Sequence, residues 1–289
     1  MSHPLLEVRG VSKRFPENGI QAADAATLTL ASREIRAIVG ENGAGKSTLV
    51  QIVAGALVPD SGDVIVDGAV LPPGDALAAR TAGVVMSYQH PRLDRELTVL
   101  ENLFLGEEPL RWGLFFDRAA ARDRVQTVAP DFSERLLRRR LGSLSSGQVR
   151  MVSLVAALLR LPDDRPGILI LDEPTEASTP AEVDRIFDVI RSSSARGHGI
   201  IFISHRLPEV ARIADAVTVL RAGRTVATFA QPFRVEEVAE AMVGSASTAE
   251  PRASTAEPRA CTAEPRACTD AAVRVPAHRR SGPAEPRPR

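Results

Sequence analysis

The sequence predicts an α/β fold with a mainly parallel sheet. Four stretches combine consecutive aliphatic residues with a bounding glycine, as strands buried on both faces of a sheet do: EIRAIVG (34–40), GILILDE (167–173), GIIFISH (199–205) and AVTVLRAG (216–223). A further candidate is AGVVMSYQ (82–89). Helical patterns lie between these strands, and such alternation is typical of a parallel sheet with helices on both sides.

Helices are predicted where apolar residues recur on one face of a 3.6-residue period. The segment 45–55 follows the first strand and places Leu49, Ile52 and Val53 on one face. The segment 146–160 repeats this spacing with valines and a leucine. The region from about 93 to 161 is mostly helical in pattern and interrupts the alternation, which predicts a helical subdomain inserted in the α/β core.

Residues 1–244 are predicted to form the folded domain, and residues 245–289 a disordered tail. The tail repeats STAEPRA, STAEPRA and CTAEPRA. The proline in each repeat excludes a coiled coil, and the composition offers little to bury. Cys261 and Cys268 fall where the earlier copies have serine, so we interpret them as drifted serines and not as metal ligands. A docking tail is the alternative interpretation.

Charge and hydropathy narrow the class of protein. The formal net charge of zero disfavours a general nucleic-acid binder. The opening MSHPLLEVRG does not resemble a signal peptide, and the longest apolar stretch, MVSLVAALL, is too short to cross a bilayer. We therefore expect a cytoplasmic protein, which is a peripheral subunit if it serves a membrane.

Residues 40–48, GENGAGKST, fit the phosphate-binding pattern G-x-x-x-x-G-K-[ST], between a predicted strand and a predicted helix. The glycines let successive N–H groups point at phosphate oxygens, and the helix N-terminus adds its positive end. Lys46 is expected to face the β- and γ-phosphates, Ser47 a Mg²⁺ ion, and Thr48 the α-phosphate. The predicted nucleotide contacts in this loop are Gly40, Glu41, Asn42, Gly43, Ala44, Gly45, Lys46, Ser47 and Thr48.

Two further motifs extend this site. The strand ILILDE ends in Asp172 and Glu173; beside a phosphate loop, Asp172 is expected to hold Mg²⁺ through water and Glu173 to accept a proton from attacking water. These residues predict a nucleoside triphosphatase. LSSGQ (144–148) opens the helix 146–160 and predicts a second anion site. A protein that already holds its own phosphates needs such a site only if it serves another molecule's nucleotide.

With Gln89 in YQH and His205 in ISHRLPE, these motifs resemble, in order, the five motifs of the ATP-binding cassette (ABC) family, over residues 5–244. The resemblance implies a P-loop NTPase core, an antiparallel β region near the N-terminus, and two cassettes packed head to tail with ATP and Mg²⁺ between them. It also implies that Phe15 lies under the adenine. The implied catalytic residues are Glu173, His205 and Gln89; the implied metal-site residues are Ser47, Gln89 and Asp172; and the signature acting in trans is Ser145, Ser146, Gly147 and Gln148.

Within the family, VSKRFP, TVLENLFLGEEP and AEAMVG are most similar to the first cassette of monosaccharide importer ATPases of the ribose, xylose and galactose type. That resemblance implies a membrane permease and, indirectly, an extracytoplasmic solute-binding protein as partners, no nucleic acid, and a location on the cytoplasmic face of the membrane. In that subfamily the residues after EPT commonly end in a threonine, so the resemblance implies that Thr179 is a trait of the subfamily. Glu176 and Ser178 depart from the expected alanine and leucine, which affects the contact expected across a cassette pair.

Several alternatives remain open from the sequence. The second cassette of the fused importers is absent, so the chain is either a single-cassette subunit or a truncated one; the intact catalytic motifs favour the first. A nucleic-acid or ribosome factor usually carries two cassettes or a long basic insertion, and the one basic cluster here is ERLLRRRLG (134–142). A third alternative is a catalytically weak partner that binds nucleotide for another cassette.

Overall fold

The computed structural model describes residues 3–17, 19–87, 93–111, 114–176 and 178–244. The predicted tail, with both cysteines, lies outside these residues, and so does Gln89. In the described part of the chain, no helix is long and apolar enough to cross a bilayer.

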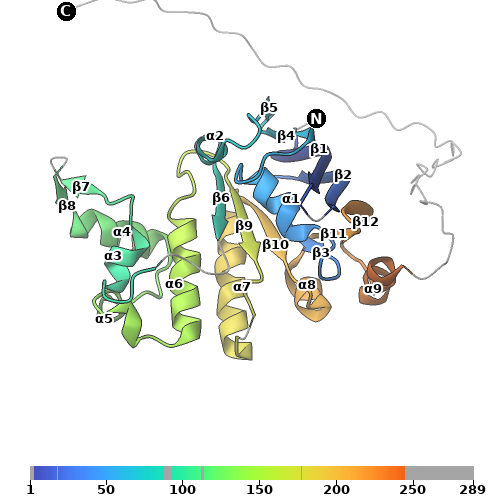
Figure 1. Ribbon diagram of the computed structural model, residues 1–289. Helices are drawn as coiled ribbons and strands as arrows, with labels where there is room; N and C mark the ends of the chain where they lie inside the picture. Colours follow the sequence, from blue (N-terminus) through green and yellow to red (C-terminus); the bar gives the residue numbers. More distant parts are fainter. Residues whose placement is uncertain (1–2, 18, 88–92, 112–113, 177, 245–289) are drawn as a thin grey trace, which may run out of the picture. The chain divides into compact units, whose positions relative to one another are not determined.

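The centre of the fold is a six-stranded sheet in the order β12-β11-β3-β10-β9-β6 (Figure 1). Its strands are β3 (Ile35–Val39), β6 (Val84–Ser87), β9 (Ile168–Asp172), β10 (Gly199–Ile203), β11 (Ala216–Arg221) and β12 (Arg224–Ala230). All adjacent pairs are parallel except β11 with β12, which is antiparallel. The predicted parallel sheet is therefore confirmed, and the apolar runs 168–171 and 200–203 are fully buried, as interior strands require.

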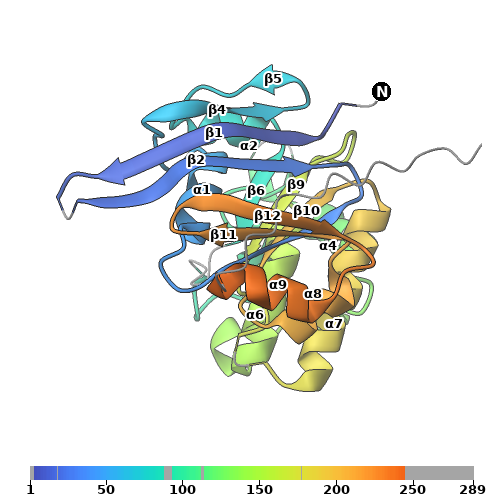
Figure 2. The ribbon, with the colours of Figure 1, turned by 90° about the vertical axis from the view of Figure 1, so that its right-hand side faces the viewer.

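Helices cover the two faces of this sheet unequally. Alternate residues of the strands point to opposite faces, so that Ile38 packs with helix α1 (Lys46–Val53), whereas Val39 packs with the opposite helical layer. That layer consists of α6 (Ser146–Leu158), α7 (Pro180–Ala195), α8 (Leu207–Ile213) and α9 (Val235–Val243). Figure 2 shows these four helices together, beneath the strands of the central sheet. The helix that follows the glycine-rich loop and the helix that begins at LSSGQ thus lie on opposite faces.

An antiparallel sheet packs over α1, as the resemblance implied. Its order is β2-β1-β4-β5, with β1 (Leu6–Phe15), β2 (Ile20–Leu30), β4 (Ser61–Val66) and β5 (Ala69–Val70). The short helix α2 (Ala76–Thr81) leads from it to β6. Buried residues of β1, β2 and β4 form one core with those of α1, which holds the glycine-rich loop between the two sheets.

Residues 93–161 contain a compact group of helices, namely α3 (Val99–Leu103), α4 (Arg118–Val128), α5 (Glu134–Leu137), the 3₁₀ turn η1 (Leu141–Ser143) and α6. They share an apolar core that includes Phe104, Val125 and Val155. A hairpin of β7 (Leu110–Arg111) and β8 (Phe115–Phe116), which the sequence pattern does not predict, interrupts the helices. The boundaries of a helical subdomain stay a prediction, and this core gives it a physical basis.

Candidate active site

The predicted site residues follow strands whose carboxyl ends lie at one edge of the central sheet. In the parallel register Ile203 of β10 is level with Ile38 of β3 and with Asp172 of β9. The glycine-rich loop therefore leaves β3, His205 follows β10, and Glu173 follows β9, all at the same edge. A neighbouring set of parallel carboxyl ends is where α/β proteins place their ligands.

The glycine-rich loop is held by the backbone around it. Gly45 has φ of 99° and stands at the N-cap of α1. A Cβ at this position would lie 2.1 Å from the carbonyl oxygen of Ala22 on β2, so only glycine fits the approach of the two segments. The amide of Gly223 donates to the carbonyl of Ala44 at 3.0 Å. At Gly43, also in the left-handed region, a Cβ would meet no atom within 4 Å, so this side of the loop is open.

Lys46 lies inside the loop. Its Nζ donates to the carbonyl of Gly40 at 2.8 Å and to that of Glu41 at 2.9 Å, and the residue is 8% exposed. Burial lowers the pKa of the Lys46 ammonium from its ordinary value, while Glu173 and Asp172 act to raise it. The two carboxylates are thus close enough to sense the cation, as a shared phosphate site requires.

Asp172 and Ser47 meet beside this cation. Burial and the neighbouring charge of Glu173 raise the pKa of the Asp172 carboxyl, whereas Lys46 and a hydrogen bond with the Ser47 side chain lower it. The structure therefore brings together a hydroxyl at the start of α1 and a carboxylate at the end of β9. Two carboxylates crowded at the end of one strand form a site that favours cations.

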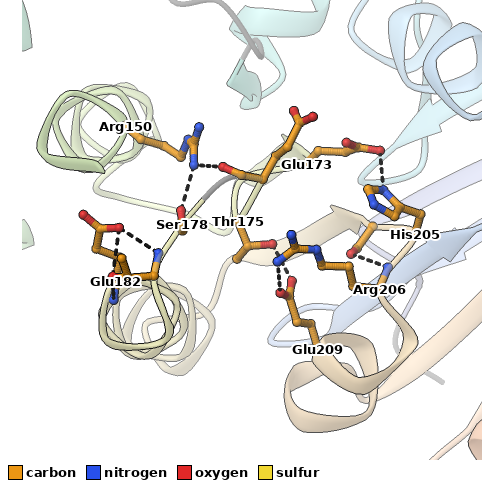
Figure 3. Close-up of polar contacts among 11 residues, drawn as sticks. Arg150, Glu173, Thr175, Ser178, Glu182, His205, Arg206 and Glu209 are labelled. Carbon is orange, nitrogen blue, oxygen red and sulfur yellow. Dashed lines mark hydrogen bonds and ion pairs between the residues drawn. The ribbon is translucent and has the colours of Figure 1, made fainter. Parts of the chain in front are cut away.

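Glu173 and His205 form a pair across the ends of β9 and β10. The Nδ1 of His205 lies 3.0 Å from Oε1 of Glu173, and Figure 3 shows the two side chains facing each other. Glu173 has φ of 48°, in the left-handed region that costs a non-glycine residue free energy. Its amide donates to the carbonyl of Ile203 at 3.1 Å, which holds the strained residue against β10.

The signature LSSGQ forms the start of α6, as predicted. The Ser145 hydroxyl accepts from the amide of Gln148 at 3.2 Å, and the Gln148 side chain accepts from the amide of Ser145 at 3.1 Å. This is a capping box that fixes the helix N-terminus. Ser145, Ser146 and Gln148 are exposed. Gly147 is partly buried, and a Cβ there would collide with the carboxylate of Glu182 on α7.

Glu176 and Ser178, which depart from the residues expected in the family, follow Glu173, and one arginine contacts both of them. Nη1 of Arg150, on α6, donates to the Ser178 hydroxyl at 2.7 Å and also to the carbonyl of Glu176. Thr179 is the N-cap of α7, and the amide of Thr179 donates to Glu182 at 2.9 Å. Thr179 therefore has a structural role in the start of the helix.

Phe15 is the last residue of β1, where it pairs with Ile20 and is partly buried. Its contact with adenine remains a prediction. Gln89 is the second residue after the end of β6 at Ser87 and lies outside the described residues. Sequence reasoning missed Arg150, Thr175, Glu182, Arg206 and Glu209. The spacing of Thr179 and Glu182 is a capping-box signal that was readable in advance; the Arg150 contacts join different elements and carry no local signal.

Residues 23–176 match the sequence profile described as ABC transporter. The chain belongs to the ABC transporter family. Over 246 residues the cassette is 40% identical to the ribose import ATP-binding protein RbsA 1 of Rubrobacter xylanophilus, a match that covers 83% of this chain and 47% of that protein. It is 40% identical over 227 residues to a putative ribose/galactose/methyl galactoside import ATP-binding protein of Burkholderia lata, covering 78% of this chain and 43% of that one.

The cassette thus spans about half the length of the curated relatives it matches. Among solved structures, an ATP-binding cassette of an ABC transporter superposes with a TM-score of 0.70 and 26% identity, over 82% of this chain and 94% of that one. A dimeric bacterial ABC transporter cassette superposes with a TM-score of 0.66 at 21% identity, over 79% and 100% of the two chains. These likenesses confirm the predicted P-loop NTPase fold with its parallel and antiparallel strands.

Proposed function

We propose that the cassette binds and hydrolyses ATP as the energy-supplying subunit of an importer, with a monosaccharide as the transported solute. The observation that carries the proposal is the convergence of Lys46, Ser47 and Asp172 with the Glu173–His205 pair at one edge of the sheet. The names of the relatives, which are ribose or galactose import ATP-binding proteins, support the solute class. The specificity itself is expected to lie in a permease and a solute-binding protein.

The glycine-rich loop supplies the phosphate site. Its backbone N–H groups and the N-terminus of α1 attract the phosphate oxygens, and the open side of Gly43 leaves room for them. The hydrogen-bond acceptors of the Lys46 ammonium are two neutral carbonyls, those of Gly40 and Glu41. A nucleotide phosphate would therefore be a stronger partner for the ammonium than the carbonyls are.

Ser47 and Asp172 fit a Mg²⁺ ion. Mg²⁺ is bound by hard oxygen ligands and usually keeps several waters, so one or two protein oxygens beside substrate phosphates are enough. The Ser47 hydroxyl and the Asp172 carboxylate are in contact, and within the described residues no cluster of three or more Asp, Glu, His or Cys side chains offers an alternative metal site. When bound, the ion would neutralise phosphate charge as it develops.

In this proposal, Glu173 and His205 activate and orient the water that attacks the γ-phosphate. A general base must lie within hydrogen-bond reach of the proton that it removes. Glu173 is placed next to Asp172 and is held by Ile203 and His205, so that its carboxylate keeps one orientation. His205, which is 52% exposed in its side chain, would orient the same water and donate a hydrogen bond to the γ-phosphate.

A second cassette completes the site in this proposal. The loop helix α1 and the signature helix α6 lie on opposite faces of the sheet, and the signature serines are exposed at a helix N-terminus. Head-to-tail pairing would let the signature of one chain cover the phosphates held by another. We place the pair on a membrane permease, at the cytoplasmic face of the membrane.

Phosphate release from ATP is the test. The wild-type cassette, at high concentration and with Mg²⁺, is expected to hydrolyse ATP, and Lys46→Ala is expected to abolish it. The intact Glu173–His205 pair favours hydrolysis over a role as a nucleotide-binding partner alone. ATP hydrolysis that persists in Lys46→Ala would contradict the assignment of the site.

A further inference from the structure

Loop 173–179 connects β9 to α7, and it carries Glu173 at its start and Thr179 at its end. Short internal bonds shape it: the amide of Glu176 donates to the carbonyl of Glu173 at 3.2 Å, and that of Ser178 to the carbonyl of Thr175 at 3.2 Å. The first of these bonds joins the backbone of Glu176 to that of Glu173, so a shift of Glu176 acts directly on Glu173. The placement of Glu173 therefore depends on what anchors the loop.

One anchor comes from α8, which begins just after His205. The hydroxyl of Thr175, a residue that is 2% exposed, hydrogen-bonds the carboxylate of Glu209. Glu209 also pairs with Arg206 at 2.9 Å. These contacts join the loop to the helix that follows the histidine of the site (Figure 3).

A second anchor is Arg150 on α6, two residues after the signature ends at Gln148. Its Nη1 reaches the carbonyl of Glu176 and the hydroxyl of Ser178, and Figure 3 shows the side chain extending from α6 to the loop. Both acceptors lie in the segment between Glu173 and α7. Charged donors make the stronger hydrogen bonds of proteins.

We infer that Arg150 is a positioning residue for hydrolysis: it ties Glu176 and Ser178 to the signature helix, so that the position of α6 contributes to the position of the Glu173 carboxylate, together with the bonds of Glu173 to Ile203 and His205. The inference rests on the proposed function, in which Glu173 acts on the attacking water. It gives Ser178 a role, because a hydroxyl at this point accepts a hydrogen bond from Arg150 and an aliphatic side chain does not.

The inference predicts a selective effect on the chemical step. The hydrogen-bond acceptors of Lys46 are the carbonyls of Gly40 and Glu41 in the glycine-rich loop, and Arg150 contacts neither of these residues, so we expect ATP affinity not to depend on Arg150. Misplacing a catalytic group by about 1 Å costs up to about 100-fold in rate. Loss of Arg150 is therefore expected to lower kcat by about 10- to 100-fold and to leave the Kd for ATP unchanged.

The experiment uses the full chain and compares Arg150→Gln, Ser178→Ala and the double variant by kcat, by ATP Kd and by thermal unfolding. Arg160→Gln is the matched control, because Arg160 also donates to backbone carbonyls, those of Ala156 and Leu105, without touching the loop. The double variant is expected to be no slower than Arg150→Gln alone, because the contact that Ser178→Ala removes is already lost in Arg150→Gln. Arg150→Lys, which keeps a cationic donor, is expected to recover part of kcat.

A kcat for Arg150→Gln that equals that of Arg160→Gln, or independent effects of Arg150→Gln and Ser178→Ala, would overturn the inference. Amide hydrogen exchange separates it from the proposed function. Exchange at Glu176 and Ser178 is expected to accelerate in Arg150→Gln and not in Arg160→Gln, whether or not the wild type hydrolyses ATP. Unchanged exchange refutes the anchor, whereas a wild type that never hydrolyses ATP refutes the proposed function.

Discussion

Glu173→Gln is the substitution that most sharply separates the chemical step from binding. Glutamine keeps the size of the side chain and still offers an oxygen to Nδ1 of His205, which lies 3.0 Å from the carboxylate. It removes the base. Loss of a general base typically costs about 10²- to 10⁴-fold in rate, which corresponds to about 2.7–5.4 kcal/mol in the barrier at about 1.36 kcal/mol per tenfold.

Binding should respond in the opposite way. Glu173 adds negative charge beside the phosphate site and stands near Lys46, so a neutral amide leaves ATP affinity unchanged or slightly higher. The variant is expected to accumulate as an ATP-bound pair of cassettes. Its unfolding temperature should stay near that of the wild type, because the amide of residue 173 keeps its backbone bond to Ile203.

The assay is single-turnover hydrolysis with ATP already bound, quenched at intervals and read as phosphate, in the presence of the partner that completes the site. Glu236→Gln is the control, since it makes the same chemical change on the exposed part of α9 and is expected to cleave at the wild-type rate. If Glu173→Gln cleaves as fast as Glu236→Gln, the base is not Glu173 and the assignment of the loop is wrong.

Further predictions concern binding, metal, pH and the tail. Lys46→Ala is expected to abolish tight ATP binding in calorimetry without unfolding the sheet, because the ammonium lies inside the loop; an unchanged affinity would contradict the phosphate site. Ser47→Ala should raise the Mg²⁺ concentration needed for half-maximal hydrolysis, which a Mg²⁺ titration of the rate measures, and an unchanged requirement would remove Ser47 from the metal site. Burial lowers the pKa of His198, whose Nδ1 accepts from the amide of Gly167 at 3.0 Å. Because the unfolded state takes up this proton first, the free energy of unfolding should fall as pH drops from above the ordinary histidine pKa of about 6.5 toward 5. Urea unfolding of the wild type and of His198→Gln across this pH range measures how the free energy of unfolding changes with pH. The same change with pH in both proteins would refute the prediction. Truncation after Gly244 should leave the unfolding temperature and ATP affinity unchanged, and a fall in either would mean that the tail packs on the domain.

The sequence predicts those parts of the fold that depend on local patterns. The apolar runs 168–171 and 200–203, bounded by glycine, are typical of interior strands, and the glycine-rich sequence between a strand and a helix is typical of a phosphate-binding loop. Parallel strands then bring Lys46, Asp172 and His205 to one edge without further information. The spacing from Leu49 to Val53 likewise predicts the buried face of α1, which the core confirms.

Contacts between elements distant in sequence were beyond such reasoning. Arg150 meets Ser178 across 28 residues because α6 and α7 pack side by side on the same face of the sheet, and no local pattern specifies which residues face each other there. The hairpin 110–116 is missed for a different reason. Its strands have two residues each, with exposed Leu110 and Phe115, so neither alternation nor burial marks them in the sequence.

The central claim is that one cassette supplies the phosphate loop and another supplies the signature. The dependence of the hydrolysis rate per molecule on protein concentration tests it most directly. The account predicts slow hydrolysis when the cassette is dilute and monomeric, with a rate per molecule that rises with concentration or with added permease. A high turnover that stays the same at every concentration, from a protein shown to be monomeric throughout, would contradict the account.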